Sequence, residues 1–451
     1  MTNRRTFLRD LLVTGGALGA LGSATGLSRL VAAGGEAAVR RHYVFAYFSG
    51  GWDILLSLDP RDPASTTAEE NRITPDYDAL SNPPTTEVRT FAGIELGPHI
   101  GMLSDHAASL AIVRGMSMET LTHEVGRRRF LTGKAPSGLT ARGSSASTWI
   151  ASRIGGSDPV PNLSTGSVET YNSDQPSYAS ALTVRGGADL VRVFTPGTSA
   201  LEPTQADILQ AFLASEAACD RARHAAALRE AEAARLRLGD MLESNLAGLF
   251  DIGRLDASVR ERFGVTNTTY TTPEAQTLIA YQALTNGVSR CISLAATAES
   301  LDTHFNDWGQ NQGTRQQRGF DAIARLVTAL QGTPYAPAGF TPDGSSWLDH
   351  TTIVGFSEFS RTPLRNDRGG RDHWLGNSCF LIGGNVRPGV IGRSSDYGME
   401  PQPIDLETGA YDPEGEVVRP EHVLRTLLVD AGITADEADL RVDPIPALVA
   451  I

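Results

Sequence analysis

The stretch Leu348–Gly392, LDHTTIVGFSEFSRTPLRNDRGGRDHWLGNSCFLIGGNVRPGVIG, places charged residues between two apolar runs. The runs Thr351–Phe356 and Ser378–Ile382 are typical of short buried strands. The segment between them is rich in glycine and contains Glu358, Arg361, Asp372 and His373. Because α/β proteins hold ligands and metals in loops at strand ends, we expect a metal-dependent site here.

Apolar runs and helical patterns alternate along the rest of the chain. Strands are predicted at His42–Phe48, Leu110–Arg114 and Arg290–Ala296, with short β-like pieces within Thr183–Phe194. Helices are predicted at Thr122–Thr132, Ser147–Ile154, Pro273–Ser289, Thr314–Leu330 and Pro420–Ala431. This alternation predicts an α/β fold of three layers, α/β/α, in which helices cover both faces of a mostly parallel central sheet.

The region Gln205–Phe250 differs from the rest, because it is rich in Ala, Leu, Arg and Glu with apolar residues at helical spacing. We expect a helical insertion over about residues 205–250, formed by a long amphipathic helix or a helical hairpin that is either structural or a lid.

The N-terminus carries a localisation signal. The sequence NRRTFLR, from Asn3 to Arg9, precedes an apolar run diluted by glycine, and small residues follow near Val31-Ala32-Ala33. This order is typical of a twin-arginine export signal; the alternative is a basic terminus beside a short apolar helix. We expect residues 1–35 to be removed, residues 36–451 to form one domain, and the twin-arginine translocase to export it folded to the periplasm or the exterior. The run is too weak for a stable membrane anchor.

Charge and cysteine content exclude some classes of function. Removing residues 1–35, with four arginines and one aspartate, changes the formal net charge from −13 to −16. This balance disfavours nucleic-acid binding, which depends on neutralising phosphates. The cysteines Cys219, Cys291 and Cys379 are odd in number and widely spaced, so they predict neither a disulfide framework nor a thiolate metal motif.

Several acids and histidines lie within a few residues of predicted strand ends, and such ends meet at one edge of a parallel sheet. The predicted metal ligands are Asp53, Asp302, His304, Glu358, Asp372 and His373. Carboxylates with imidazoles suit zinc first, then manganese or iron, with calcium or magnesium possible if the acids dominate. A bound cation would polarise an ester oxygen and lower the pKa of bound water.

Each of these residues also has an ordinary structural interpretation. A pair such as Asp302 and His304 is more often a cap or a surface hydrogen bond than a set of metal ligands, and Glu358 suits a salt bridge with Arg361. Asp53 follows two glycines and suits a turn. Only their joint placement favours a site.

Four motifs resemble a known family: FSGGWD at Phe48–Asp53, RTP after Glu358, GGRDHW at Gly369–Trp374, and the following GGNV and PGVIG. They resemble an exported bacterial family catalogued as domain of unknown function 1501, from about Tyr43 to the C-terminal helix. That family is grouped with the alkaline phosphatase and sulfatase superfamily. The resemblance implies an alkaline-phosphatase-like fold with a divalent-metal site.

The resemblance also implies roles for individual positions. Asp53 is similar to the superfamily's first-strand metal ligand, Asp302 and His304 to its middle ligands, and His373 to its last histidine ligand. Glu358 stands where many members have the aspartate of a ligand pair, but Phe359 replaces the second ligand. The implied ligand set is therefore incomplete.

The nucleophile is the main departure from that superfamily. Counting back from Thr132-Gly133 by the sulfatase spacing reaches His123, where sulfatases carry a modified cysteine and phosphatases a serine or threonine. We interpret His123 as a metal-site residue or a general acid or base, and Thr122 as a candidate nucleophile at a helix N-terminus. The alternative is a Thr cap followed by an exposed His.

Three arginines, Arg127, Arg361 and Arg371, are predicted to bind an anionic substrate, because a guanidinium holds phosphate or sulfate with two parallel hydrogen bonds. Their alternative is surface pairing with acids. Trp52 and Trp374 could form an apolar or sugar-stacking wall, or simply pack.

Two functions are therefore open. One is a secreted metal-dependent hydrolase of phosphate or sulfate esters; the other is a non-catalytic exported protein that binds metal, glycan or a partner.

Overall fold

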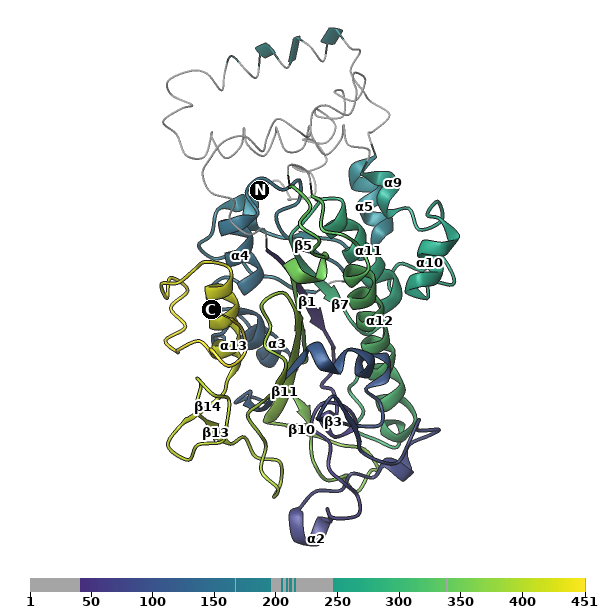
Figure 1. The fold of residues 1–451 in the computed structure, drawn as a ribbon, viewed down its shortest axis with the longest axis vertical. Coiled ribbons are helices and arrows are strands. Elements are labelled where there is room, and N and C mark those ends of the chain that lie inside the picture. Colours follow the sequence, from purple (N-terminus) through teal and green to yellow (C-terminus); the bar gives the residue numbers. More distant parts are fainter. Residues whose placement is uncertain are drawn as a thin grey trace.

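The computed structural model describes residues 41–166, 168–195, 246–337 and 340–450, with a few positions between 204 and 215. The predicted signal peptide and most of the predicted helical insertion lie outside the described residues. Figure 1 shows a central sheet with helices on both sides.

The central sheet has eight strands in the order β12-β4-β11-β8-β1-β7-β5-β6. In that order they are Gly389–Ile391, Leu110–Ser117, Gly376–Gly383, Thr351–Phe356, His42–Tyr47, Cys291–Ala295, Leu163–Ser164 and Leu182–Thr183. All neighbours pair parallel except β11, which is antiparallel to both β4 and β8. The predicted mixed α/β fold with a mostly parallel sheet is therefore confirmed.

Helices cover the two faces of this sheet because side chains of each strand alternate between them. Val44 and Ala46 of β1 pack in one core with α11 (Pro273–Thr285) and α12 (Gly313–Gln331), whereas Tyr43 packs in a second core. The second core contains buried residues of α3 (His123–Thr132), α4 (Ala146–Ile154) and α13 (Pro420–Asp430). Figure 1 shows these two groups of helices on opposite sides of the sheet.

Smaller elements surround the three layers. The remaining α-helices are α2 (Ala68–Asn71), α5 (Gly187–Phe194), α9 (Ala247–Phe250) and α10 (Ala257–Phe263). Short 3-10 helices span Ile54–Leu56, Tyr77–Ala79, Gly101–Ser109, Ser177–Ala179 and Leu348–His350, and a π-helix, Trp308–Gln312, precedes α12. Three two-stranded sheets pair β2 (Arg89–Phe91) with β3 (Ile94–Leu96), β9 (Ser360–Arg361) with β10 (His373–Trp374), and β13 (Pro403–Ile404) with β14 (Glu416–Val417).

One secondary-structure prediction was largely wrong. Thr183–Phe194 was expected to contain β pieces, but it contributes only the end of β6 and then forms helix α5. Leu190 and Phe194, four residues apart, are both buried on this helix. A short apolar run fits either a strand or one face of a helix, and here tertiary packing selects the helix.

The direction of β11 decides where the site forms. Because β11 is antiparallel to β4 and β8, its first residues lie at the edge where β1, β4, β7 and β8 end. Residues that precede β11 therefore meet residues that follow the other strands. In Figure 1 this edge lies near the label β10.

Candidate metal centre

Three histidines converge on one oxygen of Asp302. The Oδ1 atom of Asp302 lies 2.9 Å from Nε2 of His304, 3.2 Å from Nε2 of His373 and 3.4 Å from Nε2 of His123. The Nε2 atoms of His304 and His373 are themselves 2.9 Å apart. The structure thus brings together four candidate residues from three separate segments of the chain.

The opposite ring nitrogen of each histidine faces a hydrogen-bond acceptor. Nδ1 of His123 lies 2.7 Å from Oε1 of Glu358, and Nδ1 of His304 lies 2.6 Å from Oδ1 of Asp372. Nδ1 of His373 lies 2.6 Å from the backbone carbonyl of Leu121. Metal-bound histidines are typically held in this way, with a carboxylate or carbonyl accepting the second N–H.

Each of these histidines faces an acceptor on both sides of its ring. Nδ1 faces a carboxylate or carbonyl oxygen, and Nε2 faces Oδ1 of Asp302. A neutral imidazole can carry its hydrogen on either nitrogen. With the hydrogen on Nδ1, that hydrogen bond is kept and Nε2 presents a lone pair, which is the state that binds a metal ion.

The donor set fits a transition-metal ion. His123, Asp302 and His373 can each present one ligand atom within 4.8 Å of the others, and Nε2 of His304, outside that group of three, lies 2.9 Å from both Nε2 of His373 and Oδ1 of Asp302. Three imidazoles and one carboxylate suit zinc, manganese or iron, while calcium and magnesium prefer oxygen ligands. The side chains are between 19% exposed for His373 and 37% exposed for Asp302, so the centre is open to solvent.

Electrostatics keep the acids of this group ionised. Burial opposes the ionisation of Asp302, but the hydrogen bond and charge of Arg361 hold its pKa well below its usual range. Burial also opposes the ionisation of Glu358, but the hydrogen bond and charge of His123 and hydrogen bonds from backbone N–H groups together outweigh it and lower the pKa. Two carboxylates are therefore negative at neutral pH, as metal binding requires.

Two glycines allow the chain segments to approach each other. A Cβ on Gly126 of α3 would lie 2.3 Å from the backbone oxygen of Glu358, and one on Gly370 would lie 2.2 Å from the backbone carbon of His304. Only glycine permits both contacts. Gly126 lets α3 pack closely against the Glu358 segment, and Gly370 lets the GGRDHW loop pack closely against His304.

Glu358 and Asp372, predicted as ligands, lie outside the central group as acceptors for its histidines. Glu358 is 1% exposed and also accepts from the backbone N–H of Gly50 at 2.8 Å. The side chain of Asp372 is 42% exposed and pairs with Arg368 at 2.9 Å. In this geometry both residues orient histidines.

Asp53 is held elsewhere, although it was predicted as a metal ligand. It is fully buried, accepts from Trp308 Nε1 at 2.9 Å and lies 3.2 Å from Nε of Arg371. Its other oxygen accepts from the backbone of Leu55 and caps a 3-10 helix, as the turn interpretation expected. Burial raises the pKa of this carboxyl, and Arg371 opposes the rise.

Two of the three predicted substrate arginines are buried. The side chain of Arg361 bonds to Asp302 at 2.7 Å, to the carbonyls of Gly50 and Gly51, and to the carbonyl of Arg371. Arg371 bonds to backbone carbonyls of Thr74, Pro75 and Thr362 as well as pairing with Asp53. Both side chains are 0% exposed, which is at odds with direct substrate binding.

Arg127 and Thr122 remain accessible. The side chain of Arg127 is 23% exposed and pairs with Glu169 at 3.0 Å. Thr122 is exposed and is the N-cap residue of α3, but its side chain makes no capping hydrogen bond. Its hydroxyl is therefore not committed to the helix.

Trp52 and Trp374 differ in environment. Trp52 is fully buried and donates to Oδ1 of Asn377 at 2.8 Å, so it packs in the core rather than forming a sugar-stacking wall. Trp374 is half-buried and donates to the carbonyl of Met399.

Comparison with known proteins identifies the family. Residues 40–408 match the family described as "Protein of unknown function (DUF1501)". The chain belongs to this family. No curated protein matches it. Among solved structures, it is similar to the crystal structure of Ps i-CgsB in complex with k-i-k-neocarrahexaose, with 10% identity over 90% of this chain and 75% of that one and a TM-score of 0.39. That similarity is too low to support a conclusion about fold or ligand.

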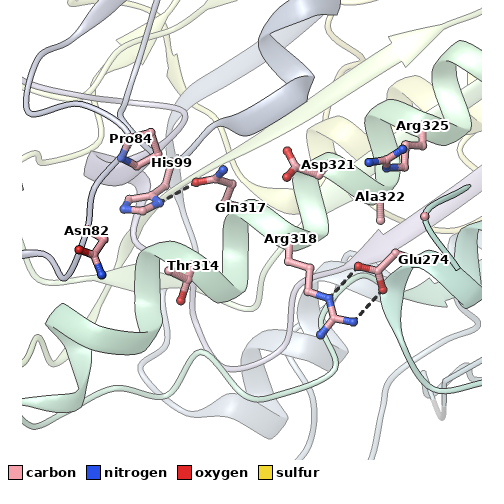
Figure 2. Close-up of a pocket in the computed structure, with 11 residues that line it drawn as sticks. Asn82, Pro84, His99, Glu274, Thr314, Gln317, Arg318, Asp321, Ala322 and Arg325 are labelled. Carbon is pink, nitrogen blue, oxygen red and sulfur yellow. Dashed lines mark hydrogen bonds and ion pairs between the residues drawn. The ribbon is translucent and has the colours of Figure 1, made fainter. Parts of the chain in front are cut away.

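In this DUF1501 protein a larger cavity, of about 340 Å3, lies away from the histidine group along the outer side of α12. Figure 2 shows two bonded pairs among its side chains: Arg318 pairs with Glu274, and His99 with Gln317. None of its lining residues belongs to the candidate metal centre.

Two contributors to the metal centre could not be predicted from residue type. The Leu121 carbonyl orients His373, but a backbone oxygen leaves no mark on residue type. Phe359 is buried with its ring 4.7 Å from that of His123 and 4.2 Å from that of His373, measured between centroids. Phe359 stands where the resemblance implied a second ligand, and its ring packs against two histidines of the group instead.

Proposed function

We propose that this protein is an exported metal-dependent hydrolase of phosphate or sulfate esters, related to the alkaline phosphatase and sulfatase superfamily. The observation that supports the metal site is the convergence of three Nε2 atoms on one oxygen of Asp302, with each Nδ1 held by an acceptor. His123, Asp302, His304 and His373 would hold the ion, with zinc first and manganese or iron next. This assignment adds His123 to the predicted ligands and removes Asp53, Glu358 and Asp372 from them.

The residues around the ion have separate tasks. A zinc ion bound here would supply Lewis acidity and an activated water or alkoxide. Glu358 and Asp372 orient two of the histidines, and Arg361 keeps the carboxylate of Asp302 ionised. The hydroxyl of Thr122, next to His123 at the start of α3, is the candidate nucleophile.

Export is proposed from the N-terminal sequence, NRRTFLR followed by a glycine-rich apolar run. Among the residues that the structure describes, no helix is both long and apolar enough to cross a bilayer. The proposed destination is the periplasm or the exterior, reached through the twin-arginine translocase.

The second candidate is a non-catalytic exported protein that uses the same centre to bind metal or glycan. In the part of the chain that the structure describes, neither cysteine is available as a nucleophile: Cys291 and Cys379 are fully buried, and burial raises the pKa of both thiols. Thr122 is then the side chain whose replacement separates the two functions.

Elemental analysis of protein purified without added metal tests the site. We expect about one equivalent of zinc, manganese or iron in the wild type and in the control His106→Ala, whose side chain contacts Thr328 away from the centre. The variants His304→Ala and His373→Ala should contain much less metal. Equal metal content in all four proteins would refute the site.

A panel of aryl phosphate and aryl sulfate esters then tests catalysis. Thr122→Ala should retain metal and lose turnover if Thr122 is the nucleophile. Metal-loaded wild type without turnover on any ester would favour the binding protein.

A further inference from the structure

A smaller cavity, of about 230 Å3, opens beside the candidate metal centre. It lies between α3 and the carboxyl ends of β1 and β7. Its walls include Tyr47, Ser49, Arg127, Val168, Ala295 and Thr297.

Three features of the structure connect this cavity to the metal centre. Arg127 follows His123 by four residues on α3, so the two side chains share a helix face one turn apart. The Tyr47 side chain interacts with Glu358, the residue that orients His123. Ser300, also on the wall, accepts a hydrogen bond from the backbone N–H of Asp302 at 3.2 Å.

The cavity wall is rich in hydroxyl groups and carries one cation. Tyr47, Ser49, Thr297 and Ser300 supply hydroxyls. Thr297 is 8% exposed, and its Oγ1 atom has no hydrogen-bond partner; Nε of Arg127 has none either. A buried polar atom without a partner costs free energy, so a polar ligand that draws these groups into hydrogen bonds would reduce that cost.

Two acids lie at this cavity, and each is exposed and paired with an arginine. Glu299 lines the cavity, with a side chain that is 65% exposed and pairs with Arg315 at 2.8 Å. The Glu169 side chain, which pairs with Arg127 at 3.0 Å, is 44% exposed. Exposed ion pairs contribute only about 0 to 1 kcal/mol, so an anion can compete for Arg127. The interior of the cavity therefore favours a group that has hydroxyls and one negative charge.

We propose that this cavity is the substrate subsite of the metal centre and that it takes one ring of an acidic sugar, with Arg127 binding the acidic group and Thr297 a hydroxyl. The inference rests on the proposed function, because the adjacent metal centre would act on the bond next to that ring. The volume is below the roughly 300–1,000 Å3 of drug-sized sites, which matches a single ring better than a longer chain.

Calorimetric titration of the zinc-loaded full chain tests the subsite. The probes are glucuronate, which carries a carboxylate, galactose 6-sulfate, which carries a sulfate, and neutral glucose. At least one acidic sugar should bind about tenfold or more tightly than glucose, and the better one identifies the acidic group.

Variants assign the binding to the cavity. Arg127→Gln should weaken binding of the acidic sugar by about tenfold or more, and Thr297→Val, which keeps the volume, by a few fold. The matched control is Arg128→Gln, because Arg128 also lies on α3 near Glu169 but does not line the cavity. It should bind as the wild type does.

Metal content measured on the same samples separates the two proposals. The subsite alone would be overturned if the acidic sugars did not bind to zinc-loaded protein. It would also be overturned if Arg127→Gln and Arg128→Gln lost the same amount of sugar affinity. Wild type that takes up no metal would overturn the proposed function. If Arg127→Gln does not fold, the test rests on Thr297→Val. Wild-type affinity of Thr297→Val for the acidic sugar would then refute the assignment of the cavity.

Discussion

Replacing Glu358 by glutamine keeps the shape of the side chain and removes its charge. Oε1 of Glu358 lies 2.7 Å from Nδ1 of His123 and 2.8 Å from the backbone nitrogen of Gly50, and Oε2 lies 3.0 Å from the hydroxyl of Ser357. A glutamine can keep its oxygen toward His123 and donate its N–H to Ser357. The variant should therefore fold but hold His123 with a weaker, uncharged acceptor.

The expected loss is in metal affinity. Removing a residue that orients a metal-bound histidine typically weakens binding about 10- to 100-fold, or about 1.4 to 2.7 kcal/mol. Glu358 is 1% exposed, so little solvent screens its interaction and we expect the upper part of that range. The side chain of Asp372 is 42% exposed, so Asp372→Asn should lose about tenfold or less.

Competition with a chromophoric zinc chelator at fixed pH measures both losses. The matched control is Glu421→Gln, because Glu421 is also a buried glutamate, 8% exposed, but pairs with Arg129 away from the centre. Its zinc affinity should equal that of the wild type. Wild-type affinity in Glu358→Gln, or a greater loss in Asp372→Asn, would show that the histidines are not positioned as described.

Three further predictions concern stability. Gly126→Ala should lower the free energy of unfolding, measured in urea, by about 1 to 3 kcal/mol, because the added Cβ would lie 2.3 Å from a backbone oxygen. The control Gly253→Ala, at an exposed position, should change it by less than about 0.5 kcal/mol. Burial would raise the pKa of Asp59, but Arg61 and Arg114 lower it below its ordinary value. The ionised carboxylate therefore stabilises the fold above pH ~4, and this stabilisation is lost as the pH falls through the lower folded pKa. Asp59→Asn should flatten this acid-induced loss of stability, and an unchanged pH profile would contradict the pairing. Zinc at about 100 times its Kd should raise the free energy of unfolding by about 2.7 kcal/mol, and His304→Ala should abolish that gain; an equal gain in both proteins would indicate binding elsewhere.

Much of the fold follows from local sequence patterns. The run Thr351–Phe356 forms β8 with the predicted bounds, and α3 ends at Thr132 as predicted, where Gly133 follows in a left-handed conformation. Residue type makes both predictions, since β8 is a continuous run of β-branched and apolar residues and glycine readily adopts the left-handed conformation that ends a helix. Thr183–Phe194 has apolar residues that fit either a strand or one face of a helix, and packing decided its structure.

The candidate site was only partly predictable. Asp302, His304 and His373 were singled out as ligands because they lie beside strands, and the structure brings them together. Proximity to a strand end could not separate them from Asp53, which lies at the end of β1 but is held by Arg371. Nor could it show that Arg361 and Arg371 are buried, since burial depends on which loops cover a side chain.

The sequence by itself determined the alternation of strands and helices, the acidic character of the chain and the residues with metal-binding chemistry, because these depend on residue type and spacing. Only the tertiary structure decided which of those residues meet. Strand β11 runs antiparallel to its neighbours and so brings His373, which precedes it, to the edge where β4, β7 and β8 end. Strand direction and loop contacts arise from packing between distant segments, and local patterns do not encode them.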